Sequence, residues 1–261
     1  MDMPRHASTQ RDHHRCTVPV SSRAVDFPAG HIRPLHHHSA AQLIYAVDGV
    51  MVISSEAGQW IVPPTQAIWM PAYMAHTVRM VNAVTMRTLY IQPDAASGLP
   101  DRCHTVAISD LLRQLILSAM NITGEYTADS RDGRLMGLLL DELNFLPVLP
   151  LHLPLPTHPY LAEICKQIRD APDDKRTLRE WAQVVGVDPK TVQRTFAQQV
   201  GMTFGQWRQQ ARLLMALERL ATGQSVLDVA LSMGYDSPSA FTAMFKKQLG
   251  VVPSEYFRLS E

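Results

Sequence analysis

The order of hydrophobic and polar residues predicts strands in the first third of the chain. From about residue 24 to residue 93, short apolar runs with period-two alternation are separated by turn pairs such as Asp48-Gly49. Alternation places every second side chain on the same face of a strand. One such face carries His76, Val78 and Met80. Several short strands at this spacing predict a small β-barrel or sandwich.

A helical period follows the strands. Two leucine-rich segments within residues 99–147 repeat at spacings of three and four residues, which predicts two amphipathic helices. Their apolar positions are Ile108, Leu111, Leu112, Leu115, Ile116 and Ala119, and then Leu135, Leu138, Leu139, Leu143 and Leu146. Such helices can cover the barrel or form a dimer interface, and the pattern leaves both open.

The proline-rich segment 148–158 predicts a domain boundary, because so much proline favours an extended polyproline linker over a helix. On this division, residues 21–98 form the barrel and residues 159–261 a second domain. Residues 1–20 are polar and rich in His and Arg, which favours a flexible tail.

The last hundred residues contain an internal repeat. Gly186 recurs 48 residues later as Gly234, and Pro189 recurs 49 residues later as Pro238. Glycine suits a helix end that needs a positive φ, and proline suits the first turn of the helix that follows. Two helices joined by so short a turn predict a helix-turn-helix, and the sequence contains two copies.

A long helix is expected between the two copies, from Thr203 to Ala221. At about 1.5 Å per residue it spans about 28 Å. That length is close to one turn of B-DNA, about 34 Å. A rigid connector of this length can hold two recognition helices over successive major-groove segments of one DNA face.

These motifs resemble the DNA-binding domain of AraC-type transcription regulators. The matching segments are GVDPKTVQRTF, GMTFGQW, SVLDVALSMGYDSPSAFTAMFKK and GVVPSEYFR, which together cover nearly all of residues 157–261. The resemblance implies a regulator, activator or repressor, that binds double-stranded promoter DNA in a sequence-specific way as a homodimer. An activator of this kind would also contact RNA polymerase. The expected fold class is α+β, with a β-barrel and two helices followed by an all-α domain.

The first recognition helix offers side chains suited to reading bases. Its helical period turns Val192 and Phe196 inward, which leaves an outward set. That set is Lys190, Thr191, Gln193 and Arg194. Arginine can bind guanine, and glutamine adenine, through two hydrogen bonds, so Gln193 and Arg194 suit base edges. The resemblance places base contacts at Lys190, Gln193 and Arg194.

The second recognition helix offers different chemistry. Phe241 and Phe245 should be core, and the outward set is Ser239, Ala240, Thr242, Ala243 and Lys246. Since these side chains have few paired donors, we expect contacts to phosphate and to thymine methyl groups. Residues 157–261 hold 13 Lys and Arg against 11 Asp and Glu, so nonspecific DNA affinity should be modest.

A histidine cluster marks the early strands. His36, His38 and Gln42 share one parity and should face the barrel interior, whereas His37 should face outward. The pattern H-x-H-x3-Q-x6-G, followed by P-x4-H ending at His76, resembles the two motifs of cupins. Cupins are small barrels that often hold a divalent metal through three histidines and a glutamate, and AraC-type regulators often carry one as a sensor domain.

Two positions depart from the cupin pattern, since Gln42 replaces the glutamate and Tyr73 replaces a glycine. Three neutral imidazoles can still bind Zn, Ni, Co or Fe. Alternatively the histidines line a pocket for a small organic effector, or they are structural. The runner-up function, a metal-dependent cupin enzyme with a DNA-binding appendage, needs an acid-base group that the motif does not supply. A constitutive DNA binder with a purely structural barrel is the third possibility.

The amino-acid composition does little to decide between these possible functions. The charges balance at 24 Lys and Arg against 24 Asp and Glu, so any attraction to nucleic acid must be local. The three cysteines form no C-x-x-C pair, which argues against a disulfide framework and fits a reducing cytosol. With no signal-peptide pattern and no long apolar run, the sequence predicts a cytoplasmic protein with no membrane partner.

Overall fold

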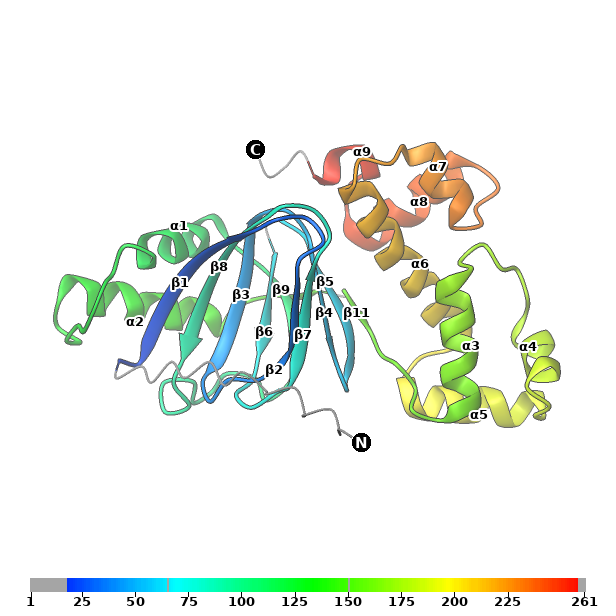
Figure 1. The fold of residues 1–261 in the computed structure, drawn as a ribbon, viewed down its shortest axis with the longest axis horizontal. Coiled ribbons are helices and arrows are strands. Elements are labelled where there is room, and N and C mark those ends of the chain that lie inside the picture. The colour runs from blue at the N-terminus through cyan, green and yellow to red at the C-terminus, as the bar shows by residue number, and fades with distance from the viewer. Residues whose placement is uncertain (1–17, 65, 150, 258–261) are drawn as a thin grey trace, which may run out of the picture.

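The computed structural model describes residues 18–64, 66–149 and 151–257, which form an N-terminal β domain and a C-terminal helical domain (Figure 1). The predicted tail lies outside the described residues up to residue 17. The α+β fold class is confirmed. Each helix in the described ranges is too short or too polar to span a lipid bilayer.

The β domain consists of two antiparallel sheets that face each other as a flattened barrel. The first sheet has the order β1-β8-β3-β6-β9-β10 and the second the order β11-β5-β4-β7-β2. The strands are β1 (Val20–Phe27), β2 (Ile32–His36), β3 (Ala41–Asp48), β4 (Met51–Ser55), β5 (Gly58–Val62), β6 (Gln66–Met70), β7 (His76–Met80), β8 (Val84–Ile91), β9 (His104–Ala107), β10 (Val148–Leu149) and β11 (His152–Leu153).

Alternation along the strands fills the space between the sheets. Met51 and Ile53 on β4 and Trp60 on β5 are fully buried in a cluster that also holds Val78 and Met80. The predicted turn after β3 is present, with Gly49 at φ 83°. A Cβ there would lie 2.1 Å from the carbonyl oxygen of Ala83, so only glycine fits.

Two helices, α1 (Asp110–Ala119) and α2 (Arg131–Leu143), cover the outer face of the first sheet. Ser109 and Ser130 cap their N-termini by accepting backbone N–H bonds. The inward side chains Leu112, Ile116 and Leu139 are buried in one cluster with apolar side chains of β3 and β8. The helices therefore cover the barrel, which was one of the two roles left open.

The segment around the proline-rich stretch differs from its expected structure. Residues 104–107, placed in the helical region, form β9, and residues 148–149 and 152–153, placed in the extended linker, form β10 and β11. β10 and β11 lie at the edges of the two sheets. Proline is tolerated at sheet edges, where no second neighbour needs its missing N–H, so a proline-rich segment can still pair there.

The C-terminal domain is entirely helical over its described residues. Its helices are α3 (Pro159–Asp170), α4 (Leu178–Val184), α5 (Pro189–Val200), α6 (Phe204–Ala221), α7 (Val226–Ser232), α8 (Pro238–Leu249) and α9 (Pro253–Tyr256). The pairs α4–α5 and α7–α8 are the two predicted helix-turn-helix units, and α6 connects them (Figure 1). Gly186 and Gly234 adopt positive φ angles of 67° and 77° in the two turns, as expected.

The two domains pack against each other through an apolar interface. Val52 and Ile61 on the outer face of the second sheet, with Val50 just before β4, belong to the same buried cluster as Leu213 and Leu217 of α6. Polar contacts flank this cluster. They are the Arg79–Glu218 ion pair, a hydrogen bond from Asn82 to the Ala221 carbonyl oxygen, and one from Gln66 to the Tyr256 hydroxyl. β4 is apolar on both of its faces because both faces are covered.

Candidate DNA-binding interface and effector site

The first recognition helix, α5, begins at a strong N-cap. Asp188 Oδ1 accepts hydrogen bonds from the backbone N–H groups of Lys190 and Thr191, at 3.0 and 3.1 Å. Val192 and Phe196 are buried as predicted. This anchoring leaves Lys190, Gln193 and Arg194 exposed and Thr191 half-buried. Three long polar side chains therefore project from one short helix face, the arrangement that a major-groove reader needs.

The second recognition helix, α8, has the same frame with a different outer face. Phe241 and Phe245 are fully buried, and Ser237 caps the helix by accepting a 3.2 Å hydrogen bond from the N–H of Ala240. The outward set is exposed at Ser239, Ala240, Ala243 and Lys246 and half-buried at Thr242. Most of these side chains are short. They can contact phosphate or a methyl group but cannot form paired hydrogen bonds to a purine.

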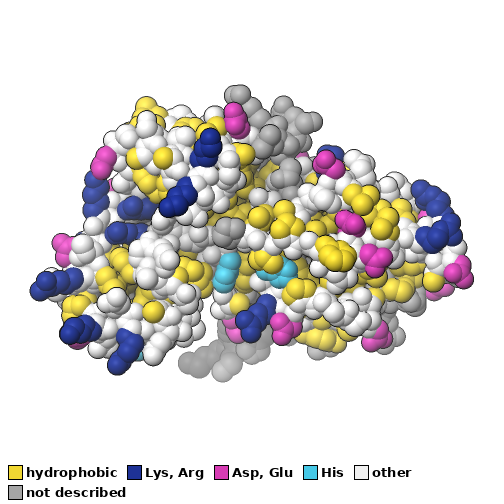
Figure 2. Space-filling view, turned by 180° about the vertical axis from the view of Figure 1, so that it is seen from behind, with side chains coloured by type: hydrophobic (Ala, Val, Ile, Leu, Met, Phe, Trp, Pro, Cys, Tyr) yellow, Lys and Arg dark blue, Asp and Glu magenta, His cyan; other side chains and the backbone are white. Residues whose placement is uncertain are grey.

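Positively charged side chains are clustered on part of the helical domain. Figure 2 shows several Lys and Arg side chains gathered at the end of the molecule that this domain forms, at the left of the view. Lys246 and Lys247 lie in the last turn of α8, where they also complement the negative end of the helix dipole.

The predicted histidine cluster is assembled inside the barrel. His36 ends β2, His38 follows it, and His76 begins β7, which pairs with β2 at His36 and His76. One ring nitrogen from each lies within 4.8 Å of the others, and all three side chains are buried. His37 is exposed, as its opposite parity predicted. The sequence motifs therefore place three imidazoles at one point.

Backbone carbonyls fix the orientation of two of the rings. His36 Nδ1 lies 2.7 Å from the carbonyl oxygen of Pro34, and His76 Nδ1 lies 2.9 Å from that of Met74. A carbonyl only accepts, so each Nδ1 donates the hydrogen bond, and in the neutral ring the lone pair then lies on Nε2. Metal-binding histidines are typically oriented in this way.

Burial keeps His76 neutral. Its pKa is lowered to about 4, first by desolvation and then by the neighbouring His36 and basic side chains, against the bond to Met74. His76 Nε2 is buried and has no hydrogen-bond partner. A neutral imidazole with a buried, unused lone pair is the form that ligates a metal.

Gln42 is buried on β3 and its amide orientation is set by Thr88. Gln42 Nε2 donates to Thr88 Oγ1 at 2.8 Å, and Thr88 Oγ1 in turn donates to the carbonyl oxygen of Leu43 at 3.0 Å. Gln42 Oε1 is buried without a partner. The residue that replaces the cupin glutamate thus retains an unused oxygen acceptor.

Tyr73, at the position of the cupin glycine, adopts a backbone conformation that favours glycine. Its φ is 64°, the only positive value at a non-glycine residue among the described residues. The Tyr73 N–H donates to the carbonyl oxygen of His38 at 2.7 Å, while the side chain is exposed. A strained residue therefore ties down the loop that carries His38.

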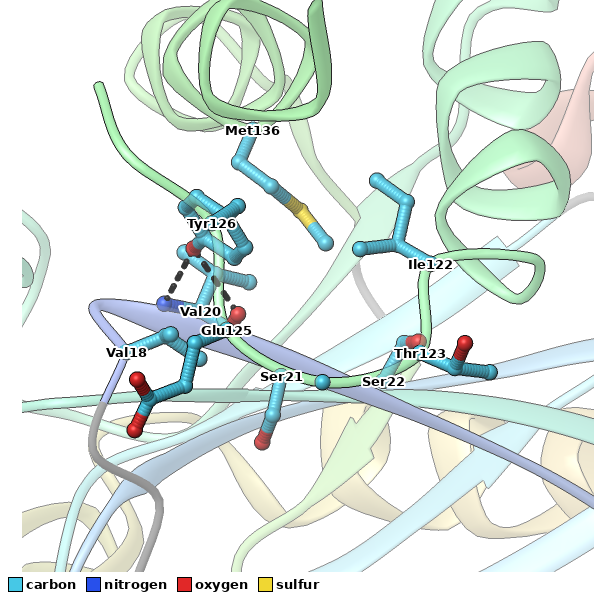
Figure 3. A pocket seen from close by; sticks show the side chains of 10 residues that line it. Val18, Val20, Ser21, Ser22, Ile122, Thr123, Glu125, Tyr126 and Met136 are labelled. Carbon is cyan, nitrogen blue, oxygen red and sulfur yellow. Dashed lines mark hydrogen bonds between the residues drawn. The ribbon is translucent and has the colours of Figure 1, made fainter. Parts of the chain in front are cut away.

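A cavity of about 380 Å³ lies outside the barrel between β1 and the α1–α2 loop (Figure 3). The Tyr126 hydroxyl accepts a 3.0 Å hydrogen bond from the Val20 N–H and donates a 2.9 Å bond to the Val20 carbonyl oxygen. Ser22 Oγ donates to the carbonyl oxygen of Ala119 beside it. No local pattern in the sequence indicates this cavity, because its walls come from segments about a hundred residues apart.

Sequence reasoning also missed the polar contacts between the domains. Arg79 lies on β7 three residues after His76, and its side chain leaves the opposite face of the strand to pair with Glu218 on α6. β7 thus touches the histidine cluster at one end and the connector helix through its outer face. No local pattern could reveal a pair separated by 139 residues.

Two helix-turn-helix units on one connector, joined to a barrel with a buried polar cluster, define a DNA-binding regulator with a sensor domain. Family models agree, because residues 21–143 match an AraC-like ligand binding domain and residues 181–259 match a helix-turn-helix domain. The chain belongs to the AraC family of transcriptional regulators, and it is a sequence-specific DNA-binding regulator whose N-terminal domain is of the effector-binding type.

Two relatives by sequence support this assignment. The chain is 37% identical over 223 residues to the HTH-type transcriptional regulator NimR of Escherichia coli, covering 85% of this chain and 81% of that one. It is 30% identical over 159 residues to the arabinose operon regulatory protein of Escherichia coli, covering 60% and 53%. Among solved structures, ToxT from Vibrio cholerae aligns with a TM-score of 0.39 at 9% identity, covering 92% and 98%.

Proposed function

We propose that the barrel senses a divalent metal held by His36, His38 and His76, with the amide oxygen of Gln42 as a further donor. The observation that carries this proposal is the set of three imidazole nitrogens within 4.8 Å of one another in a buried position. Carbonyl-oriented rings and a neutral His76 fit the requirement for unprotonated Nε2 ligands. Zn, Ni, Co and Fe all accept such a ligand set.

The test is metal analysis of full-length protein purified without a tag or chelator. We expect stoichiometric metal in the wild type, loss of it in His38→Ala and His76→Ala, and full retention in His37→Ala. His37 is the matched control because it lies in the same segment with its side chain exposed. Equal metal content in His37→Ala and His38→Ala would refute the assignment.

A small organic effector is the second candidate for this site. It is favoured by the aromatic neighbourhood, since the His38 ring lies edge-on to Tyr90 with centroids 5.1 Å apart, and by the family's ligand-binding domain. Metal-free protein that still changes its DNA affinity when an inducer is added would select this candidate over the metal.

On the DNA, the exposed face of α5 reads bases and that of α8 mainly contacts the backbone. Lys190, Gln193 and Arg194 supply the base contacts, and Thr191 lies beside them. The second set is Ser239, Ala240, Thr242, Ala243 and Lys246. A homodimer would bind two such sites, would meet RNA polymerase if it activates, and would act in the cytoplasm where the chromosome lies. A genome-wide binding map tests the target sites.

Signal transfer from the barrel to the DNA-binding domain runs through β7. The strand carries His76 at its start and Arg79 on its outer face, and Arg79 pairs with Glu218 of α6. Occupancy of the cluster would shift β7 and with it the connector helix. In Glu218→Gln we expect DNA affinity to respond less to the metal, while metal content stays unchanged. An undiminished response would place the coupling elsewhere.

The same features support a role in signalling rather than catalysis. An enzyme working on this cluster would need a positioned acid-base group beside the metal. The cluster of candidate ligands consists of three histidines among the described residues, and the relatives are transcriptional regulators. Turnover of a substrate by the purified protein that is lost in His76→Ala would contradict this role.

A further inference from the structure

The loop between α3 and α4 makes a second connection between the two helix-turn-helix units. We propose that this loop, residues 171–176, is a brace that fixes the angle between the recognition helices and thereby the spacing of the DNA boxes that the protein accepts. Arg212 and Gly234 are the positioning residues of the brace. Neither residue needs to touch DNA to fill this role.

A connector helix alone leaves the angle between the units loosely defined. α6 has 18 residues, and long helices bend gently along their length. Small bends at its two ends would tilt one recognition helix against the other. A second contact away from the helix axis closes a ring of first unit, connector, second unit and loop, and a closed ring resists that tilt.

Arg212 attaches the loop to the connector. From the middle of α6, its Nε donates to the carbonyl oxygen of Pro172 at 2.7 Å, and one terminal nitrogen donates to that of Asp174 at 3.0 Å. The guanidinium also lies 6.0 Å from the ring centre of Tyr235, in the turn of the second unit. One planar group thus orients the loop and the second turn together.

The loop is rigidly joined to the first unit. Asp174 accepts hydrogen bonds from the backbone N–H and from Nε of Arg176, at 2.8 and 2.7 Å. The Arg176 guanidinium stacks 3.7 Å above the ring of Trp181, a fully buried residue of α4. The backbone carbonyl oxygen of Arg176 accepts a 2.8 Å hydrogen bond from Arg208 of α6. Any movement of the loop would therefore carry α4 with it.

Gly234 brings the second unit into direct contact with the loop. A Cβ on Gly234 would lie 2.9 Å from Asp173 Cα and 3.0 Å from the Asp173 carbonyl oxygen. Beside this contact, Lys175 Nζ lies 2.7 Å from Asp236 Oδ1, but both side chains are largely exposed, so the ion pair adds little stability. The close backbone approach at Gly234 therefore defines the contact.

The repeat itself provides a control. Gly186 holds the same place in the first unit and has nearly the same φ, 67° against 77°, yet a Cβ there would meet nothing within 4 Å. Alanine at either position suffers similar backbone strain at a positive φ. Only Gly234→Ala adds a clash across the brace. The difference between the two variants isolates the brace from the strain.

The experiment uses full-length protein and a duplex obtained by in vitro selection from random DNA. Dissociation constants are measured for this duplex and for versions with one base pair inserted or deleted between the two boxes. One base pair turns one box by about 34–36° relative to the other. We expect the wild type to lose roughly tenfold or more in affinity for altered spacing, comparable with a mismatched base pair.

In Gly234→Ala and in Arg212→Gln, we expect this discrimination to fall to about two- or threefold, while Gly186→Ala keeps the wild-type ratio. A ratio cancels general losses of folded protein, and thermal unfolding of each variant verifies folding. If Gly234→Ala fails to fold, Arg212→Gln decides. Wild-type discrimination in the brace variants, an equal loss in Gly186→Ala, or an indifferent wild type would each overturn the proposal.

Discussion

The two helix-turn-helix units share a backbone plan and differ in the side chains that it presents. Both units place a glycine at positive φ in the turn, a proline in the first turn of the recognition helix, and two buried residues one turn apart beneath it. The outer face of α5 carries long donors, whereas that of α8 is mostly short. Folding thus constrains the frame, and the exposed positions are where one copy can specialise in reading bases.

The frames also differ in strength. Thr177 and Glu180 form a complete capping box at α4, with each side chain bonded to the other's backbone. At α7, Ser225 accepts from the Asp228 N–H and donates to its carboxylate instead. Together with the two backbone bonds that Asp188 accepts at α5, this caps the first unit more tightly at both of its helices.

The largest expected effect tests the shared frame. Phe196 and Phe245 are equivalent and almost fully buried. We expect Phe196→Ala and Phe245→Ala each to lower the free energy of unfolding by about 3–5 kcal/mol, through lost burial and the cavity left behind. Chemical denaturation measures this. If one variant loses less than about half of what the other loses, the two cores are not equivalent.

The next effect tests the difference in reading. Arg194→Ala should lose about 1–3 kcal/mol of binding at one base pair and relax the preference there, since a bidentate contact is removed. Ser239→Ala on α8 is the comparison, and we expect its base preference to stay unchanged. Selection from random DNA reports both. An unaltered motif for Arg194→Ala would refute the assignment of α5.

A smaller effect tests the caps. Asp188 accepts two backbone hydrogen bonds, and Ser237 accepts one. We expect Asp188→Ala to cost about 1–2 kcal/mol of stability and Ser237→Ala about 0.5–1 kcal/mol. Thermal unfolding of both variants at the same protein concentration provides the measurement. A larger loss for Ser237→Ala would reverse the ranking of the two frames.

The smallest effect concerns backbone contacts. In Lys246→Ala, affinity should fall by a similar factor for all DNA sequences, and the slope of log affinity against log salt should shrink by about 1. Lys166, exposed and paired with Asp170, provides a control charge that lies on α3 and not on a recognition helix. A change in base preference for Lys246→Ala would mean that α8 also reads sequence.

The sequence predicted features that depend on neighbours along the chain. The repeat, its turns and the connector follow from glycine, proline and helical spacing, and the parity of His37 and His38 follows from strand geometry. The structure bears out these local features, from the buried recognition-helix cores to the gathered histidines. Which exposed residues touch DNA stays a prediction.

Features that depend on distant partners could not be predicted. β10 consists of two residues between prolines and gains its form only by pairing with β9. Val52 and Ile61 give their strands an apolar outer face, and only the docked α6 explains it. The brace likewise depends on contacts between residues far apart in the sequence. In the sequence Gly234 is a glycine in a turn, just as Gly186 is, although only Gly234 contacts the loop.

Pairing within the proline-rich segment affects how this regulator can be recombined with its relatives. Leu153 completes a sheet, and the next residue, Pro154, accepts a 2.7 Å hydrogen bond from the Trp207 indole through its carbonyl oxygen. A chimera cut inside this stretch would strip an edge strand from one parent and a buried tryptophan's partner from the other. A graft should therefore take residues 151–155, α6 and the strands that α6 covers from the same parent. Both the edge pairing and the tryptophan hydrogen bond would then be kept.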